Sequence, residues 1–185
     1  MAIVVDINGS TFGRDDARIS IFDHGFLFGD SVYEVVRTYG EEPYLLREHL
    51  QRMEHSAAGI GLVLPLSQDA FDARVRAAVR RAAHGNSYVR VIVTRGEGPV
   101  HIDPAPCTSP SVIVIVQPYT PPPERDYVDG IRIRVAARLR NNVLAVDPNV
   151  KSGNYLNNVL AYAEARKTGD HDAVMCNAVG HLTEM

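Results

Sequence analysis

The sequence predicts a mixed α/β (α+β) protein of two domains, because strand-like and helix-like patterns both recur along its 185 residues. The β-branched runs at residues 88–94 and 111–116 are typical of buried strands. Apolar residues recur every three or four positions in residues 47–58 and 67–84, which predicts two amphipathic helices. The prolines at 121–123 follow these elements and are the best candidate for a linker.

The N-terminal part is predicted to begin with a strand at residues 3–7, which an Asn8-Gly9 turn ends. Residues 23–30 are expected to form a loop. The pattern of residues 31–38 does not decide between a helical turn and a strand. Residues 44–46 are expected to form a short strand before the first helix.

Each of the two predicted helices has one apolar face that should pack toward a core. In the first helix this face is formed by Leu50, Met53, Ala57 and Ile60. In the second helix, which Gly85 ends, it is formed by Phe71, Val75, Ala78, Val79 and Ala82. After the linker, a half-exposed strand is predicted at residues 131–135, a helix at 155–168, and a hairpin over 173–183 turned at Gly180.

These elements predict a small N-terminal domain over residues 1–120, an interdomain linker at 121–130, and a second domain beginning at 131 and running to 185. The second domain has only two or three strands and one helix, which are too few to bury their own apolar faces. We therefore expect that residues 131–185 are the first part of a larger domain and that the chain is truncated.

Composition excludes several classes of partner. The formal net charge is -3 and no run of five or more basic residues occurs, so we expect no nucleic-acid partner. The longest apolar run, residues 112–116, is far too short to span a membrane. Cys107 and Cys176 have no metal or redox spacing, so no metal site is expected. These two cysteines, with no visible signal peptide, favour the reducing cytoplasm.

Lys151 carries the most informative chemistry. It lies in a short segment, Val-Lys-Ser-Gly-Asn-Tyr-Leu-Asn-Asn, at the start of the predicted helix, and Glu184 follows the predicted hairpin. On spacing alone a solvated surface lysine is the favoured interpretation. A lysine in a partly apolar pocket can instead act as an amine nucleophile and proton carrier. A pyridoxal 5'-phosphate (PLP) enzyme needs such an amine for a Schiff base, and an acidic partner for the pyridine nitrogen.

Several motifs in one order resemble the class IV (fold type IV) PLP-dependent aminotransferases, the branched-chain and D-amino-acid aminotransferase group. They are Lys-Ser-Gly-Asn-Tyr-Leu-Asn-Asn from Lys151, Gly-His-Leu-Thr-Glu ending at Glu184, Gly-Asp-Ser-Val-Tyr-Glu from Gly29, Glu-His-Leu-Gln-Arg-Met from Glu48, and Tyr-Val-Arg from Tyr88. The resemblance implies a small N-terminal α/β domain, a larger C-terminal PLP domain and a homodimer.

The resemblance also implies roles for four cofactor-binding residues. Lys151 matches the catalytic Schiff-base lysine, and Glu184 matches the carboxylate that faces the pyridine nitrogen. Arg52 matches the phosphate-binding arginine, a role that suits the paired donors of a guanidinium group. Tyr155 matches the tyrosine near the phenolic oxygen of the cofactor. The alternatives are an exposed helix arginine for Arg52 and a packed core tyrosine for Tyr155.

Phe28, Tyr33, Tyr88 and Arg90 match positions that line the substrate pocket. Tyr88 and Arg90 are two residues apart and should share one face of a strand. Phe28 stands where many relatives have tyrosine, so a hydroxyl is missing there. Each of the four could instead be an ordinary core or strand residue.

Three further residues are weaker candidates. Arg95 and His101 lie in or beside the long predicted loop after residue 94 and could contact substrate. For His24, beside Asp23, a loop-capping role is favoured over acid–base chemistry.

We therefore expect transamination of a branched-chain-like amino acid, with 2-oxoglutarate as the acceptor 2-oxo acid. The alternatives are a lyase like aminodeoxychorismate lyase, a D-amino-acid or amine transaminase, and a non-catalytic fragment. The last alternative arises because the family's phosphate loop lies beyond the equivalent of Met185.

Overall fold

The computed structural model describes residues 3–184, so Met1, Ala2 and Met185, at the ends of the two predicted domains, lie outside the described residues. The chain forms two compact units. The first contains Met1–Tyr119 and Val150–Gly153, and the second contains Thr120–Asn149 and Asn154–Met185. The short segment with Lys151 therefore belongs to the unit built by the N-terminal residues.

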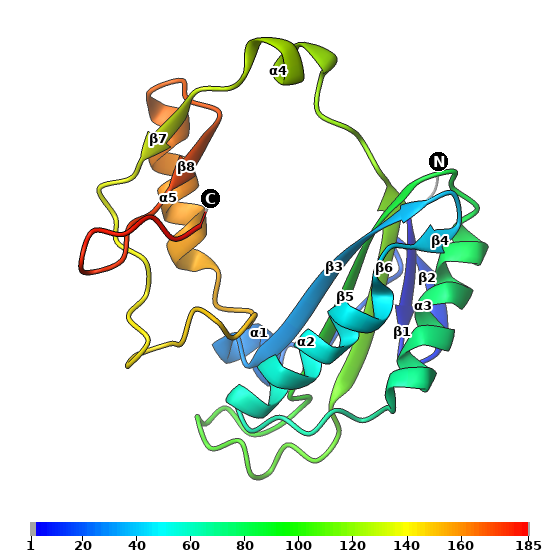
Figure 1. The fold of residues 1–185 in the computed structure, drawn as a ribbon. Helices are drawn as coiled ribbons and strands as arrows, with labels where there is room; N and C mark the ends of the chain where they lie inside the picture. The colour runs from blue at the N-terminus through cyan, green and yellow to red at the C-terminus, as the bar shows by residue number, and fades with distance from the viewer. Residues whose placement is uncertain (1–2, 185) are drawn as a thin grey trace. The chain divides into compact units, whose positions relative to one another are not determined.

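The first unit is built on a six-stranded antiparallel sheet with the strand order β2-β1-β6-β5-β3-β4 (Figure 1). Sequential pairing would place β3 beside β2, but β6 returns to lie between β1 and β5. The strands are β1 (Val4–Ile7), β2 (Ser10–Gly13), β3 (Ser31–Tyr39), β4 (Glu42–Pro43), β5 (Ser87–Thr94) and β6 (Ser111–Pro118).

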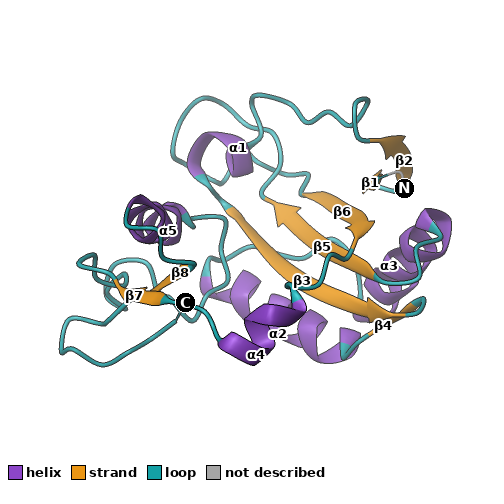
Figure 2. Cartoon of the chain, turned by 90° about the horizontal axis from the view of Figure 1, so that it is seen from above, coloured by secondary structure: helices purple, strands orange, loops and turns teal. Residues whose placement is uncertain are grey.

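Two helices, α2 (Leu46–Gly59) and α3 (Gln68–Ala82), cover one face of this sheet (Figure 2). Their apolar faces are those that the sequence periodicity predicts, and Leu50, Met53 and Phe71 are fully buried. The side chain of Ser67 begins α3 by accepting a hydrogen bond from the Ala70 N–H group. Both predicted helices are thereby confirmed.

The strands present alternate residues to opposite sides of the sheet, as the period of two requires. In β5, Val89, Val91 and Val93 are buried with the helices, whereas Tyr88, Arg90 and Ile92 are half-buried. The register of β3 against β5 pairs Tyr33 with Ile92 and Val35 with Arg90. The odd-numbered residues of β3 therefore lie on the same face as Arg90.

Three predictions of secondary structure need correction or completion. Residues 31–38, where the pattern was undecided, lie in strand β3, which is next to the last in the sheet. The predicted strand at residues 44–46 is wrong, because Leu45 adopts a left-handed backbone conformation and Leu46 already begins α2. The predicted loop at 23–30 contains the short helix α1 (His24–Phe28), which the Asp23 side chain caps at Gly25 N–H and Gly29 ends.

The second unit contains α4 (Glu124–Asp129), β7 (Ile133–Val135), α5 (Leu156–Lys167) and β8 (Asp172–Val174). Strands β7 and β8 are parallel, and α5 packs against them through small residues. The predicted strand and helix here are confirmed, whereas α4 was not predicted. The predicted hairpin is present, because the Thr183 N–H donates to the Met175 carbonyl oxygen, the Asn177 N–H donates to the His181 carbonyl oxygen, and Cys176 and Leu182 form an antiparallel bridge. No helix in the described part of the chain has the length and apolar character needed to cross a bilayer.

Candidate active site

The segment Val150–Gly153 lies along the edge of β3 and extends the sheet by one short antiparallel pairing. The backbone N–H of Tyr33 donates to the carbonyl oxygen of Lys151 at 3.0 Å, and the N–H of Gly153 donates to the carbonyl oxygen of Ser31 at 2.8 Å. Backbone pairing of this kind fixes the position of Lys151 relative to β3.

Helix α2 fixes the same segment from its other side. The Lys151 N–H donates to the fully buried hydroxyl of Ser56 at 3.0 Å. A Cβ atom added at Gly59 would lie 2.6 Å from Val150 Cγ2, so the end of the helix and the segment are in close approach. A Cβ atom at Gly153 would collide with the hydroxyl oxygen of Ser31. Glycine at these two positions therefore permits the segment to lie between α2 and β3.

The Lys151 amine lies beside a buried tyrosine. Its Nζ atom is 3.5 Å from the Tyr33 hydroxyl and 4.5 Å from the centroid of the Tyr33 ring. The Arg90 guanidinium carbon is 3.8 Å from the centroid of the same ring. Tyr33 is only 5% exposed, so these cation–π contacts occur in a largely desolvated place. Three of the predicted site residues are thus brought together.

Arg52 is held by a buried carboxylate. Glu34 on β3 is 0% exposed and accepts from Arg52 Nε at 2.6 Å and from Nη2 at 2.5 Å. The second carboxylate oxygen also lies 2.8 Å from His49 Nδ1. Burial by itself would raise the pKa of Glu34, but the hydrogen bonds and charges of Arg52 and His49 outweigh it, so the pKa lies below its usual range.

Strand β3 and helix α2 together position both Lys151 and Arg52. Arg52 and Ser56 are four residues apart on α2 and lie on one side of the helix. Tyr33 and Glu34 are consecutive in β3 and point to opposite faces of the sheet. Lys151 therefore binds to Tyr33 on β3 and Ser56 on α2. Arg52, one turn before Ser56 in α2, binds Glu34, the strand residue next to Tyr33.

The remaining substrate-pocket candidates lie elsewhere in the first unit. Tyr88 is on the same face of β5 as Arg90 and pairs in register with Arg37. Phe28 is 39% exposed and packs edge-on against His24, with ring centroids 4.9 Å apart. The His24 Nε2 atom lies 2.9 Å from the carbonyl oxygen of Pro99, which is the loop-capping role favoured for this histidine.

Arg95, a weaker candidate, is engaged within the first unit. It forms a two-bonded ion pair with Asp30 and also donates to the carbonyl oxygens of Ile60 and Gly61 at 2.8 Å. These bonds connect the start of β3 with the end of α2. His101 is exposed, and its Nδ1 atom accepts from the Asp103 N–H.

In the second unit, Glu184 belongs to a closed network of three side chains. One of its oxygens, Oε1, accepts from Arg140 Nη2 at 2.8 Å and from Asn158 Nδ2 at 2.6 Å. Arg140 also donates to the Asn158 side-chain oxygen at 2.9 Å. Tyr155 and Asn158 line a cavity of about 330 Å³ against α5 and β8. The network fixes the orientation of the Glu184 carboxylate.

Five of these residues were not predicted as site residues from the sequence: Glu34, His49, Ser56, Arg140 and Asn158. Glu34 did carry a signal, because it alternates with Val32 and Val36 and a strand would place it on their buried face. A buried carboxylate requires a cation, and Arg52 and His49 are three residues apart on the next helix. Ser56, Arg140 and Asn158 carried no comparable signal.

Residues 31–185 match the family model described as amino-transferase class IV, and the chain belongs to this family. It is 35% identical over 178 residues to the "Putative branched-chain-amino-acid aminotransferase" of Methanocaldococcus jannaschii, covering 96% of this chain and 61% of the relative. It is 32% identical over 171 residues to the D-alanine aminotransferase of Listeria monocytogenes, covering 91% of this chain and 58% of the relative.

Among solved structures, the Escherichia coli branched-chain amino acid aminotransferase superposes with a TM-score of 0.90 at 26% identity, over 100% of this chain and 62% of that one. The predicted family and the predicted mixed α/β fold are therefore confirmed. The chain spans about three fifths of the length of each of these proteins.

Proposed function

We propose that the protein transfers an amino group between an amino acid and a 2-oxo acid with PLP as its cofactor. The observation that carries the proposal is the placement of the Lys151 amine beside Tyr33 and Arg90 at the edge of β3. This amine lies on a segment fixed by both β3 and α2, as an amine that must return to one position in each reaction cycle requires.

The donor set fits this cofactor. A primary amine suits the aldehyde of PLP, a guanidinium fork suits its phosphate, and a carboxylate suits its pyridine nitrogen. Lys151 and Arg52 supply the first two in the first unit, and Glu184 supplies the third in the second unit. When bound, PLP would supply an electron sink for the negative charge that forms at the substrate Cα atom.

Each residue then has a defined task. Lys151 Nζ would hold the cofactor covalently, and after release it would take the Cα proton as general base and give it back later in the half-reaction. Arg52 would hold the phosphate, Glu184 would face the pyridine nitrogen, and Tyr155 would lie near the phenolic oxygen. Arg90 would contribute to recognition of the substrate carboxylate.

Tyr33, Tyr88 and Phe28 would line the substrate pocket with Arg90. The role of Tyr33 is supported by the contact of its hydroxyl with the Lys151 amine. The support for Phe28 and Tyr88 is the resemblance to the family and their place on α1 and on the Arg90 face of β5.

We further propose a branched-chain amino acid as donor, 2-oxoglutarate as acceptor, a homodimer and a cytoplasmic location. The branched-chain donor is supported by the names of two relatives, the Methanocaldococcus jannaschii protein at 35% identity and the Escherichia coli enzyme at 26% identity. D-Amino-acid transfer is the second candidate, because a D-alanine aminotransferase is 32% identical. The domain boundaries 1–120, 121–130 and 131–185 are part of the same proposal.

The proposal is tested by incubating the PLP-loaded protein with L-leucine or D-alanine and 2-oxoglutarate, and measuring the glutamate formed. We expect glutamate from L-leucine at a rate well above that from D-alanine. Faster transfer from D-alanine would favour the second candidate. Release of more than one equivalent of product per bound PLP, without any 2-oxo acid acceptor, would point instead to a lyase. A protein that binds no PLP would contradict the proposal.

A further inference from the structure

Glu34 is a fully buried carboxylate on β3, and its main partner is a half-exposed cation. The Glu34 side chain is 0% exposed, whereas the Arg52 side chain is 53% exposed. Taking a carboxylate out of water costs several kcal/mol, and a buried ion pair is often no more stabilising than an apolar replacement. The pair is therefore weak evidence for a purely stabilising role, and its geometry indicates a different one.

The geometry is side-on. Glu34 Oε1 accepts from Arg52 Nε, and Oε2 accepts from Nη2, so the two groups share one plane. The pair fixes the plane of the fork, and the fork is the feature that recognises a phosphate. His49 Nδ1, at 2.8 Å from Oε2, holds the carboxylate from a second direction.

We propose that Glu34 is a positioning residue that aims Arg52 at the phosphate of the cofactor, and thereby sets the preference for a phosphorylated over a non-phosphorylated pyridoxal. The proposal rests on the proposed function. Glu34 binds Arg52, so its removal should weaken phosphate recognition without weakening the rest of the pocket. The neighbouring Tyr33 contacts Lys151 from the other face of β3, which separates the two tasks along one strand.

The test is the ratio of two affinities, measured by fluorescence titration of the protein with PLP and with pyridoxal, which lacks the phosphate. Glu34→Gln keeps the side-chain shape and removes the charge. We expect it to lower the PLP-to-pyridoxal affinity ratio by about tenfold or more, the value of one charge-assisted hydrogen bond. The affinity for pyridoxal itself should stay within about threefold of the parent.

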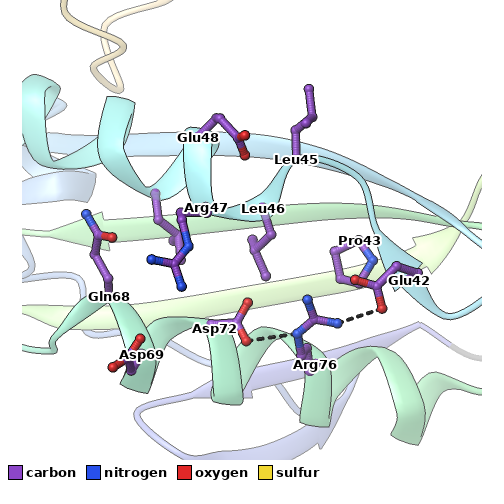
Figure 3. Close-up of a pocket in the computed structure, with 11 residues that line it drawn as sticks. Glu42, Pro43, Leu45, Leu46, Arg47, Glu48, Gln68, Asp69, Asp72 and Arg76 are labelled. Carbon is purple, nitrogen blue, oxygen red and sulfur yellow. Dashed lines mark hydrogen bonds and ion pairs between the residues drawn. The ribbon is translucent and has the colours of Figure 1, made fainter.

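A second arginine–carboxylate pair, between Arg76 on α3 and Glu42 on β4, provides a control. Arg76 on α3 also pairs with a carboxylate of the sheet, since its Nη1 donates to Glu42 at 2.7 Å and its Nε donates to Asp72 at 2.8 Å (Figure 3). These residues line a separate polar cavity of about 300 Å³ at the start of α2 and α3. Glu42→Gln removes a carboxylate–arginine bond there, in this case a single bond at an exposed carboxylate, and should leave the affinity ratio unchanged.

Two further variants show whether Glu34 acts through Arg52. Arg52→Lys keeps the charge but removes the fork, so it should lower the ratio, and adding Glu34→Gln to it should change the ratio by less than about threefold. Glu34→Asp keeps the charge with a shorter reach and should give an intermediate ratio. If Glu34→Gln does not fold, the Glu34→Asp result carries the test.

The outcomes separate the two proposals. An equal loss of affinity for PLP and pyridoxal in the Glu34 variants, or an unchanged ratio, would overturn the positioning role. A parent protein that binds PLP no more tightly than pyridoxal would instead contradict the phosphate role of Arg52 in the proposed function.

Discussion

The backbone N–H of Tyr33 donates to the carbonyl oxygen of Lys151 at 3.0 Å, and the side chains of the same two residues meet at 3.5 Å. One strand residue thus fixes both the backbone and the amine of a residue 118 positions later in the chain. This double contact is the reason that the lysine is placed by the sheet rather than by its own loop.

Tyr33→Phe removes the hydroxyl beside the Lys151 amine and keeps the ring that Arg90 packs against. We expect amino-transfer activity to fall about two- to tenfold, the value of one hydrogen bond, with little change in stability. Steady-state kinetics and thermal unfolding check this. Tyr44→Phe, on an exposed tyrosine, is the control and should behave as the parent does.

Ser56→Ala removes the buried hydroxyl that accepts from the Lys151 N–H. The N–H group is then left without this acceptor, which should cost about 1–3 kcal/mol of unfolding free energy and lower the affinity for PLP. Urea unfolding and PLP titration measure the two effects. Ser20→Ala is the matched control, because Ser20 accepts from the Phe22 N–H on an exposed loop. Equal effects of the two substitutions would contradict the account.

Gly153→Ala places a methyl group onto the Ser31 hydroxyl oxygen. The segment must then move away from β3, so we expect a loss of about 1–3 kcal/mol in unfolding free energy and weaker PLP binding. Gly85→Ala is the control, because a Cβ atom there meets no heavy atom within 4 Å. A Gly153→Ala protein with the PLP affinity of the parent would show that the close approach has no role in placing Lys151.

The lowered pKa of Glu34 predicts a pH dependence of stability. The carboxylate is stabilised in its charged form by Arg52 and His49 in the folded state, so its contribution is fully present above the ordinary pKa of about 4.5. It is lost as the pH falls from there through the folded pKa. Unfolding free energies of the parent and of Glu34→Gln, measured against pH, should therefore converge below pH 4.5.

Other carboxylates also lose stabilising contacts in acid, since the pKa values of Glu42 and Asp170 are lowered by hydrogen bonds to Arg76 and to Thr168 respectively. Both proteins share these groups, so the difference between them isolates Glu34. A difference that stays constant from neutral pH to acid would contradict the assignment.

The sequence allowed the two helices to be predicted well, because their apolar periodicity is unbroken and Ser67 is a standard helix start. It left β3 undecided because Glu34 interrupts an otherwise apolar strand pattern. The start of α2 was mistaken because Leu45 takes a left-handed conformation that is uncommon for a residue with a side chain. Tertiary contacts decide both places.

The candidate site was predictable only as a set of residue types. The motifs around Lys151 and Arg52 gave the chemistry, but neither gave the pairing of the segment with β3 or the burial of Glu34. Those features depend on which strand edge and which helix face meet, and no local pattern encodes that choice. Arg140 was missed for the same reason, since its partner Glu184 is distant in sequence.

The central claim is that the Lys151 amine holds PLP. Its most direct test is to incubate the protein with PLP, reduce it with borohydride, digest it and locate the added mass by peptide mass spectrometry. We expect a phosphopyridoxyl group on the peptide that contains Lys151, and none in a Lys151→Ala protein that is otherwise folded. Labelling of Lys167 instead, or equal labelling with and without Lys151, would contradict the claim.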